Sequence, residues 1–262
     1  MREVRAMAAA FTFLTRLPMG RVVSHELSDL SRSASYFPLV GMVVGLVGAS
    51  IFYVALFIWT PVIAIVLSVI ATVLVTGAFH EDGFADVCDG FGGGWTKEKI
   101  MEIMKDSRVG TYGSVGLILM LATKFYILQN IAVWVHNDPF TLIIILVSAH
   151  AISRFMPVLV IFTQSYSRET DDSKSKPVAQ KIDISIVFTA SVFALIPFLI
   201  LIFISNQILL FLSIPFLLII TFFMSRYFKK WIGGYTGDCL GAVQQVCEVG
   251  FYLFLVVLWK FI

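Results

Sequence analysis

Long apolar runs separated by short polar breaks dominate the chain. A run of about 20 apolar residues is long enough to cross a bilayer as an α-helix. Seven such runs predict membrane spans at 36–58, 61–79, 114–135, 139–162, 184–204, 207–224 and 240–259. Only Trp59 and Thr60 separate the first two runs, and Pro61 suits the first turn of a helix, so we expect a tight hairpin there. The pattern predicts an all-α, polytopic membrane protein of about seven spans.

The N-terminal segment before these spans has a different pattern. Residues 1–17 are moderately apolar, but Arg16 and Pro18 interrupt the run and no small-residue cleavage site follows it. This is not the pattern of a secretory signal peptide. We therefore expect an interfacial or re-entrant helix at the N-terminus.

Composition agrees with the membrane assignment. The chain has 262 residues, of which 58% are hydrophobic and 14% charged, whereas soluble domains are roughly 45–50% apolar and about 25% charged. This composition excludes a soluble globular protein, a disordered chain and a collagen-like fibre. Three cysteines exclude a disulfide scaffold, and a net charge of +2 argues against a nucleic-acid partner. No repeat divides the chain, so we expect one domain over residues 1–262.

The basic residues fall on one predicted side of the membrane. Residues 1–35 hold five Lys and Arg residues, the segments 80–113 and 163–183 hold four each, and 225–239 holds three. All four segments lie on the same side if the seven spans are right. Cytoplasmic segments of membrane proteins are enriched in Lys and Arg. The N-terminus and the large loops are therefore predicted to be cytoplasmic, with the chain in the cytoplasmic (inner) membrane.

Three acidic residues follow the second predicted span. Asp82, Asp86 and Asp89 stand at i, i+4 and i+7 on one face of a helix that we expect to continue that span into the cytoplasm. At ~6 Å and an effective dielectric of ~20, each neighbouring pair repels by roughly 3 kcal/mol. Oxygen ligands favour Mg²⁺ or Mn²⁺ over softer metals. A solvated acidic helix end is the simpler alternative, and a zinc site from His80 and Cys88 lacks suitable partners.

Two further polar segments lie on the same predicted side. The first, Asp106-Ser107-Arg108-Val109-Gly110-Thr111, places a carboxylate, a guanidinium and hydroxyls among glycines, an arrangement that can hold a phosphate. The second contains Thr236 and Asp238 before the last span. Asp238 is either a helix N-cap or part of a metal or substrate site.

A few charged residues fall inside or beside the spans. Lys124, Arg154 and Glu248 lie at membrane depth, where ionisable groups usually face a cavity or one another. The two basic residues either neutralise an anionic substrate or pair with Glu248, and the sequence does not choose between these roles. Arg16 is another candidate anion ligand.

The combined chemistry is that of phosphoryl transfer. An acidic trio that binds Mg²⁺, basic residues near it and the lack of an activated Ser or Cys favour an enzyme that joins an activated phosphate to an alcohol. No Walker-type loop is present in the sequence.

Five stretches, taken in this order, resemble the cobalamin synthase family, also called adenosylcobinamide-GDP ribazoletransferase or cobalamin-5'-phosphate synthase. They are FLTRLP at 13–18, YFPLVG at 36–41, FHEDGFADVCDG at 79–90, MKDSRVGTYG at 104–113 and TGDCLGA at 236–242. The resemblance covers nearly the whole chain. One position departs from the pattern, since Gln245 stands where family members often have an acid.

The resemblance implies a late step of cobalamin (vitamin B12) synthesis. Adenosylcobinamide-GDP would react with the 5'-hydroxyl of α-ribazole, or with α-ribazole 5'-phosphate, to give adenosylcobalamin or its 5'-phosphate and GMP, with Mg²⁺ as cofactor. The metal ligands would be Asp82, Asp86, Asp89 and Asp238, and Asp86 or Asp89 would accept the hydroxyl proton. The substrate-binding residues would be Arg16, Glu81, Asp106, Ser107, Arg108, Thr111, Lys124, Arg154, Thr236 and Glu248.

Two other functions remain as alternatives. A CDP-alcohol phosphotransferase carries a D-G-x-x-A-R pattern, but here Ala85 is followed by Asp86 rather than Arg. A cation transporter would place its acids at mid-span in broken helices, whereas this sequence predicts most of them at the cytoplasmic rim. The oligomeric state cannot be read from the sequence.

Overall fold

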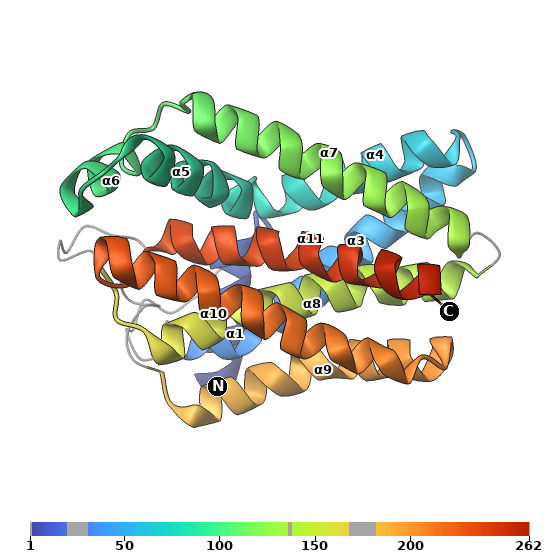
Figure 1. Cartoon of the computed structure of the whole chain (residues 1–262). Helices are drawn as coiled ribbons and strands as arrows, with labels where there is room; N and C mark the ends of the chain where they lie inside the picture. The colour runs from blue at the N-terminus through green and yellow to red at the C-terminus, as the bar shows by residue number, and fades with distance from the viewer. Residues whose placement is uncertain (1, 20–30, 136–137, 168–181, 262) are drawn as a thin grey trace.

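The computed structural model of the chain describes residues 2–19, 31–135, 138–167 and 182–261. Within these ranges the structure is helical, and β pairing is limited to one isolated bridge between Tyr166 and Tyr235. The helices are α1 (Arg2–Leu14), η2 (Ser33–Tyr36), α3 (Phe37–Leu56), α4 (Pro61–Thr76), α5 (Phe79–Gly93), α6 (Lys97–Ile103), α7 (Thr111–Trp134), α8 (Pro139–Thr163), α9 (Ile184–Ser205), η3 (Ile208–Leu212), α10 (Ser213–Ile232) and α11 (Gly237–Phe261). Figure 1 shows the long helices side by side.

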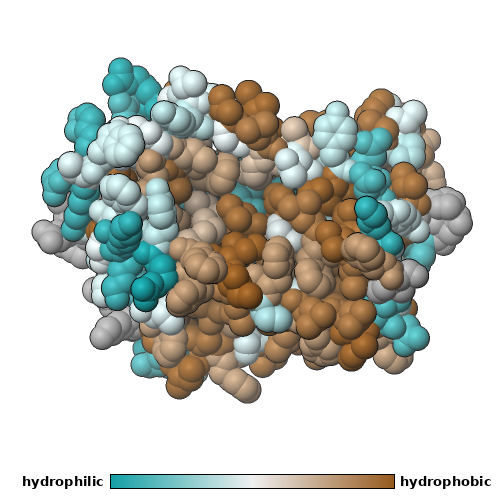
Figure 2. Space-filling model, viewed as in Figure 1, coloured by the Kyte–Doolittle hydropathy of each residue, from teal (hydrophilic) through white to brown (hydrophobic). Residues whose placement is uncertain are grey.

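The bundle has the dimensions of a membrane protein. Among the described residues, six helical segments are long and apolar enough to cross a bilayer, and the bent pair α4–α5 makes up to seven. Figure 2 shows apolar side chains across the middle of the viewed face and hydrophilic ones toward its two ends. This distribution matches a hydrocarbon layer with water on both sides. The prediction of an all-α, polytopic membrane protein is confirmed.

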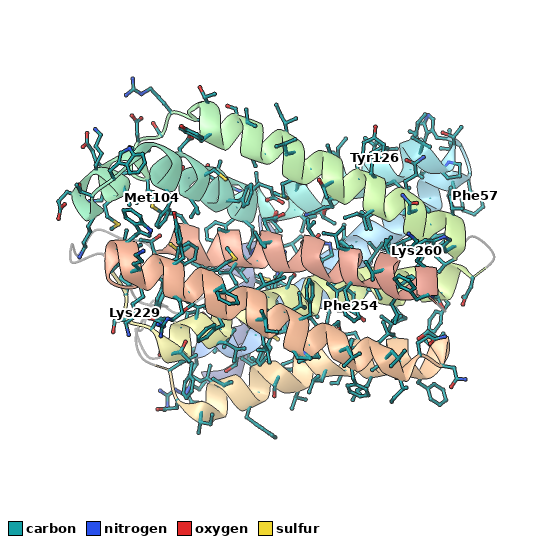
Figure 3. The ribbon with its side chains drawn as sticks, in the orientation of Figure 1. Phe57, Met104, Tyr126, Lys229, Phe254 and Lys260 are labelled. Carbon is teal, nitrogen blue, oxygen red and sulfur yellow. The ribbon has the colours of Figure 1, made fainter. Side chains whose placement is uncertain are left out.

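The two ends of the bundle carry different connections. The α5–α6 turn and the C-terminal end of α10 lie at one end, whereas the α3–α4 turn and the C-terminus lie at the other (Figure 1). Met104 and Lys229 mark the first end in Figure 3, and Phe57 and Lys260 mark the second. The α5–α6 turn and the end of α10, which were predicted to share one side, therefore lie at one end (Figure 1, Figure 3). The basic residues in 20–30 and 168–181 lie outside the described residues.

Most predicted spans agree with the helices within a few residues, but α10 is longer than the prediction. The apolar run suggested an end at 224, and the helix continues to Ile232. Arg226, Lys229 and Lys230 thus lie on its last turns rather than in a loop. Long basic side chains can extend from a helix end toward water. The apolar run in the sequence therefore ends before these residues, whereas the helix continues through them.

The largest departure from the sequence prediction is a break in the second span. The helix stops at Thr76, because Gly77 and Ala78 both have left-handed backbone conformations with φ of 64° and 57°. A second helix, α5, begins at Phe79 and makes an angle of 87° with α4. The prediction that the acidic stretch continues the helix of the second span is therefore wrong, whereas its cytoplasmic location stays a prediction. The acids lie on a separate helix, which is one arm of a broken span.

The N-terminal segment contacts the break between α4 and α5. α1 forms as a helix, although its 13 residues are too few to cross a bilayer, and it packs on η2 and α3. The backbone N–H of Arg16 donates to the carbonyl of Val75 at 2.7 Å, an acceptor that a continuous helix would have offered to Phe79. The Arg16 side chain lies over Gly77, so that a Cβ at this position would stand 3.0 Å from Arg16 Cγ. Gly77 thus combines a left-handed conformation with a close approach.

Candidate active site and a buried polar network

A cleft of about 600 Å³ opens where α5, α6 and the start of α7 meet. Its lining residues are Asp89, Gly93, Lys99, Glu102, Ile103, Asp106, Arg108, Val109, Gly110, Thr111 and Tyr112. This volume is in the range of small-molecule sites. We call it the α5–α7 cleft. It contains the segment that the sequence singled out as a phosphate-binding candidate, together with one member of the acidic trio.

Asp89 is anchored to the N-terminus of α7. One carboxylate oxygen accepts the backbone N–H of Gly110 at 2.7 Å, and the other accepts that of Gly113 at 2.8 Å. The first N–H groups of a helix have no intrahelical partner and attract negative charge. Asp89 therefore acts as a distant cap, and its two oxygens already hold α5 against α7.

Asp82 and Asp86 precede Asp89 on the same face of α5. The Asp82 side chain is exposed and Asp86 is half-buried. Among the residues that the structure describes, no three His, Cys, Asp or Glu side chains converge as a metal site. Asp89 thus differs from its two neighbours on the helix face because it is buried and hydrogen-bonded to α7. Metal binding by the trio stays a prediction.

Asp106 and Arg108 form an ion pair at the edge of the α5–α7 cleft. Arg108 Nη2 lies 2.6 Å from Asp106 Oδ2, and the Arg108 backbone N–H donates to Oδ1 at 3.0 Å. These hydrogen bonds lower the pKa of Asp106 to about 2. The Arg108 side chain is 87% exposed, so one carboxylate orients it while most of the guanidinium faces solvent. Ser107 and Thr111 are exposed beside it.

The first turn of α11 packs directly on the acidic helix. Gly83 approaches Asp238 so closely that a Cβ would stand 2.9 Å from Asp238 Cα. Thr236 caps α11, since its hydroxyl accepts the backbone N–H of Cys239 at 3.3 Å. The alternative in which Asp238 is the N-cap is therefore wrong. The backbone bridge between Tyr166 and Tyr235 holds the preceding turn in place. Asp238 thus lies next to the stretch between Asp82 and Asp86.

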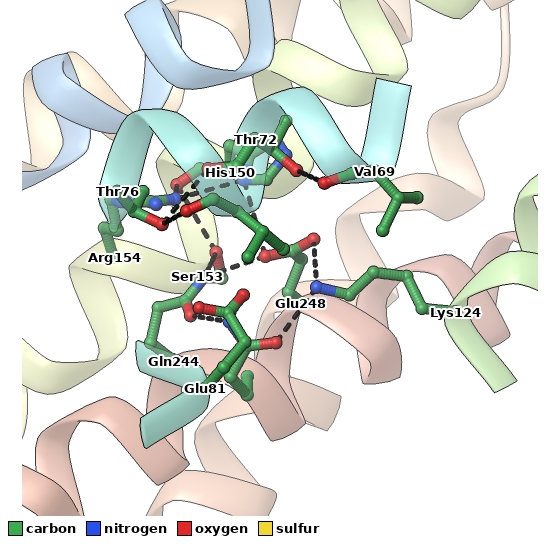
Figure 4. Close-up of polar contacts among 12 residues, drawn as sticks. Val69, Thr72, Thr76, Glu81, Lys124, His150, Ser153, Arg154, Gln244 and Glu248 are labelled. Carbon is green, nitrogen blue, oxygen red and sulfur yellow. Dashed lines mark hydrogen bonds and ion pairs between the residues drawn. The ribbon is translucent and has the colours of Figure 1, made fainter. Parts of the chain in front are cut away.

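A buried polar network fills the middle of the bundle (Figure 4). The Lys124 ammonium lies 3.0 Å from Glu248 Oε1 and donates to Gln245 Oε1 at 2.9 Å. Gln245 in turn donates to Glu81 Oε1 at 2.9 Å. Gln244 donates to Glu248 Oε2 at 2.8 Å and to Ser153 Oγ at 3.0 Å. The network joins α5, α7, α8 and α11 at membrane depth.

Two basic side chains of α8 complete the network. His150 Nδ1 lies 3.4 Å from Glu248 Oε2, and Arg154 Nη1 donates to the His150 carbonyl at 3.1 Å. The structure therefore pairs Lys124 with Glu248, which is one of the two roles left open by the sequence. Arg154 is buried beside this pair, and its Nε atom is a buried donor without a hydrogen-bond partner among the described residues. A role for either base at a substrate phosphate stays a prediction.

Sequence reasoning missed several members of this network, namely His150, Ser153 and Gln244. Only one signal was available: His150 precedes Arg154 by four residues in an otherwise apolar span, and such residues share a helix face. Gln245 drew notice only as a departure from the family pattern. Its amide both donates and accepts, which allows it to join Glu81 to Lys124.

Fold and site together define a polytopic, all-helical membrane protein with an Asp- and Arg-lined cleft at one end. The chain matches the family described as Cobalamin-5-phosphate synthase over residues 6–256, and it belongs to that family. A relative from Shewanella frigidimarina, named adenosylcobinamide-GDP ribazoletransferase, is 41% identical over 97% of this chain and 94% of its own. A relative of the same name from Leptospira interrogans is 43% identical over 98% and 97%. No solved structure matches the chain.

Proposed function

We propose that the protein transfers the adenosylcobinamide-phosphate group of adenosylcobinamide-GDP to α-ribazole or its 5'-phosphate, releasing GMP. The observation that carries this proposal is the match to named ribazoletransferases over nearly the full length of both chains. The α5–α7 cleft supports it, because the guanidinium of Arg108, oriented by Asp106, offers charge-assisted contacts for a diphosphate.

The accepting hydroxyl must be one that both acceptors carry. The sequence resemblance pointed to the 5'-hydroxyl of α-ribazole. In α-ribazole 5'-phosphate that oxygen is already esterified, and the family description names a 5-phosphate product. We therefore place the nucleophile at another ribose hydroxyl. Its oxygen attacks the phosphorus that carries the cobinamide, the bond from that phosphorus to the bridging oxygen breaks, GMP leaves, and a carboxylate takes the hydroxyl proton.

The carboxylates on α5 fit Mg²⁺ as the cofactor. Mg²⁺ is usually held by one or two carboxylates together with substrate phosphates, rather than by a cage of protein ligands. Asp82 and Asp86 lie one helical turn apart on the accessible part of α5, and Asp238 packs nearby at Gly83. When bound, the ion would neutralise charge on the diphosphate oxygens. Asp82, Asp86 and Asp238 would hold it, whereas Asp89 is committed to α7.

The remaining roles follow from position. Asp86 or Asp89 would accept the hydroxyl proton, and both Asp89 oxygens also accept backbone N–H groups of α7. Arg108 would contact the diphosphate, and Asp106 would orient it. Ser107 and Thr111 lie beside Arg108 at the same end of the bundle. Glu81, Lys124 and Glu248 would act through the buried network, whose contacts set the position of α5.

The predicted orientation places the cleft in the cytoplasm, with the protein in the cytoplasmic membrane. The basic residues of the N-terminal segment, the α5–α7 connection and the end of α10 support this orientation. Adenosylcobinamide-GDP carries a charged diphosphate and would reach the cleft from the water phase.

The test uses protein purified in nanodiscs and supplied with adenosylcobinamide-GDP, α-ribazole and a series of Mg²⁺ concentrations. GMP release measures turnover. We expect Asp82→Asn and Asp86→Asn to lower activity and to raise the Mg²⁺ concentration needed for half-maximal rate. Glu98→Gln, an exposed acid outside the cleft lining, is the matched control. Both Asn variants retaining activity within a few-fold would overturn the metal role, and no GMP from the wild-type protein would overturn the reaction.

One structural feature bears on the transporter alternative. The acids lie on one helix of a bent pair, and broken helices are typical of ion sites in transporters. A broken span also suits an enzyme, because its unpaired backbone groups and polar side chains can border a water-filled site. Family membership favours the transferase, and GMP release is the measurement that separates the two.

A further inference from the structure

A second cleft lies on the outside of the bundle, between the end of α8 and one face of α10. Its volume is about 480 Å³. Its lining residues are Leu159, Val160, Thr163, Gln164, Leu218, Thr221, Phe222, Ser225, Arg226 and Lys229. We call it the α8–α10 cleft. It shares no lining residue with the α5–α7 cleft.

The cleft lining changes from apolar to basic along α10. Leu218 and Phe222 make an apolar part, Ser225 follows, and Arg226 and Lys229 form the basic end. These positions lie on one helix face and span about 16 Å at a rise of 1.5 Å per residue. The Lys229 end lies at the same end of the bundle as Met104 (Figure 3). The apolar part therefore lies at membrane depth, and the basic part lies at the membrane surface.

The two cations of the cleft have no acidic counterpart in its lining. Among the described residues, no ion pair involves Arg226 or Lys229, although both are exposed. The Arg226 guanidinium lies over the exposed Phe222 ring at 5.8 Å from the centroid, which keeps it on the cleft wall. The cleft thus presents fixed positive charge above an apolar wall, with hydroxyl and amide groups between them.

We propose that the α8–α10 cleft binds an anionic phospholipid. The phosphate would contact Arg226 and Lys229, because a guanidinium and an ammonium at a membrane surface attract anionic headgroups. Thr163, Gln164 and Ser225 would serve the glycerol and ester oxygens. One acyl chain would follow Leu159, Leu218 and Phe222. A soluble phosphate would contact the two cations, but it has no apolar group that could pack against this wall.

Native mass spectrometry of the delipidated, full-length protein tests the proposal, with phosphatidylglycerol and phosphatidylcholine as probes. We expect phosphatidylglycerol to bind about 10-fold more tightly or better, since each basic residue near the surface contributes roughly fivefold. The double variant Arg226→Gln/Lys229→Gln should lose most of this preference. Lys105→Gln/Lys230→Gln removes two charges outside the cleft lining and should retain it.

Two further arms keep the outcome interpretable. Thr163→Trp keeps both cations and fills the cleft, so it should also weaken phosphatidylglycerol binding. Pyrophosphate added to the wild-type complex should not displace the lipid. Equal binding of the two lipids, full binding by the Arg226/Lys229 variant, or displacement by pyrophosphate would each overturn the proposal, the last in favour of a soluble phosphate site.

Discussion

The buried network and the α5–α7 cleft are both built around acid–base pairs, yet they differ in surroundings. The Lys124 and Glu248 side chains are 4% and 1% exposed and are joined to two glutamines. Arg108 is 87% exposed and has one acidic partner. A charge in a dry interior must be satisfied by protein groups, whereas a charge at an open cleft can exchange water for substrate. The first pair therefore holds helices together, and the second remains available for binding.

Breaking the inner pair should give the largest effect. Glu248→Leu leaves the Lys124 ammonium buried with only amide partners, and removing one member of a buried pair costs about 3–5 kcal/mol. Thermal unfolding of the purified protein in detergent measures this loss. The double variant Lys124→Met/Glu248→Leu removes both charges and should recover most of the stability. Losses that simply add in the double variant would contradict the pairing.

Asp89 should give an intermediate effect, because it belongs to the cleft but makes buried contacts. Asp89→Asn keeps one acceptor oxygen and turns an amide group toward Gly110 or Gly113, which should cost about 1–3 kcal/mol of unfolding free energy. Asp82→Asn is the matched control, since Asp82 is exposed and its change should stay within about 0.5 kcal/mol. If both variants unfold at the same temperature, Asp89 does not anchor α7.

The outer pair should have the smallest effect on stability and a clear effect on binding. Arg108→Gln should leave the unfolding temperature unchanged and raise the KM for adenosylcobinamide-GDP by about 10-fold, the usual range for a charge-assisted contact. Lys105→Gln, an exposed base outside the cleft lining, serves as the control. A KM within twofold of wild type would remove Arg108 from the substrate site.

The pH dependence sharpens the same contrast. Arg108 lowers the pKa of Asp106 from 3.8 to about 2. A lowered carboxyl pKa keeps the ion pair intact above the ordinary value, and the pair is lost only as the pH falls through the lowered one. The KM should therefore show no titration from Asp106 between about pH 5 and 8. A KM that begins to rise at about pH 4 in the wild type but not in Asp106→Asn would show that the carboxyl keeps its ordinary pKa of 3.8 and that the pair is not formed.

The sequence predicted the membrane spans better than it predicted the arrangement of the candidate site. Apolar runs predicted the spans, because a bilayer demands long apolar helices wherever the chain crosses it. The positions of Asp82, Asp86 and Asp89 on one helix face followed from periodicity alone. Periodicity did not predict the different surroundings of these three residues, because Asp89 accepts hydrogen bonds from backbone N–H groups that lie 21 and 24 residues further along the chain.

The break after Thr76 is a feature of the fold that depends on a contact between segments distant in sequence. Nothing in the apolar pattern marked Gly77 and Ala78 as left-handed residues. The break is sustained by Arg16, which lies on a segment far away in sequence and donates to the carbonyl of Val75. A local pattern of apolar and polar residues does not predict a contact between segments so far apart in sequence.

The sequence by itself determined that the protein is a membrane-spanning helical bundle, which segments are long and apolar enough to cross, and which family the chain belongs to. These follow from local composition and spacing, since each depends on residues close together in the chain. Only the tertiary structure decided that Lys124 pairs with Glu248, that Asp89 caps α7 and that Asp238 lies against Gly83. Each of these contacts joins two helices, and the packing that brings them together depends on the shape of the whole bundle.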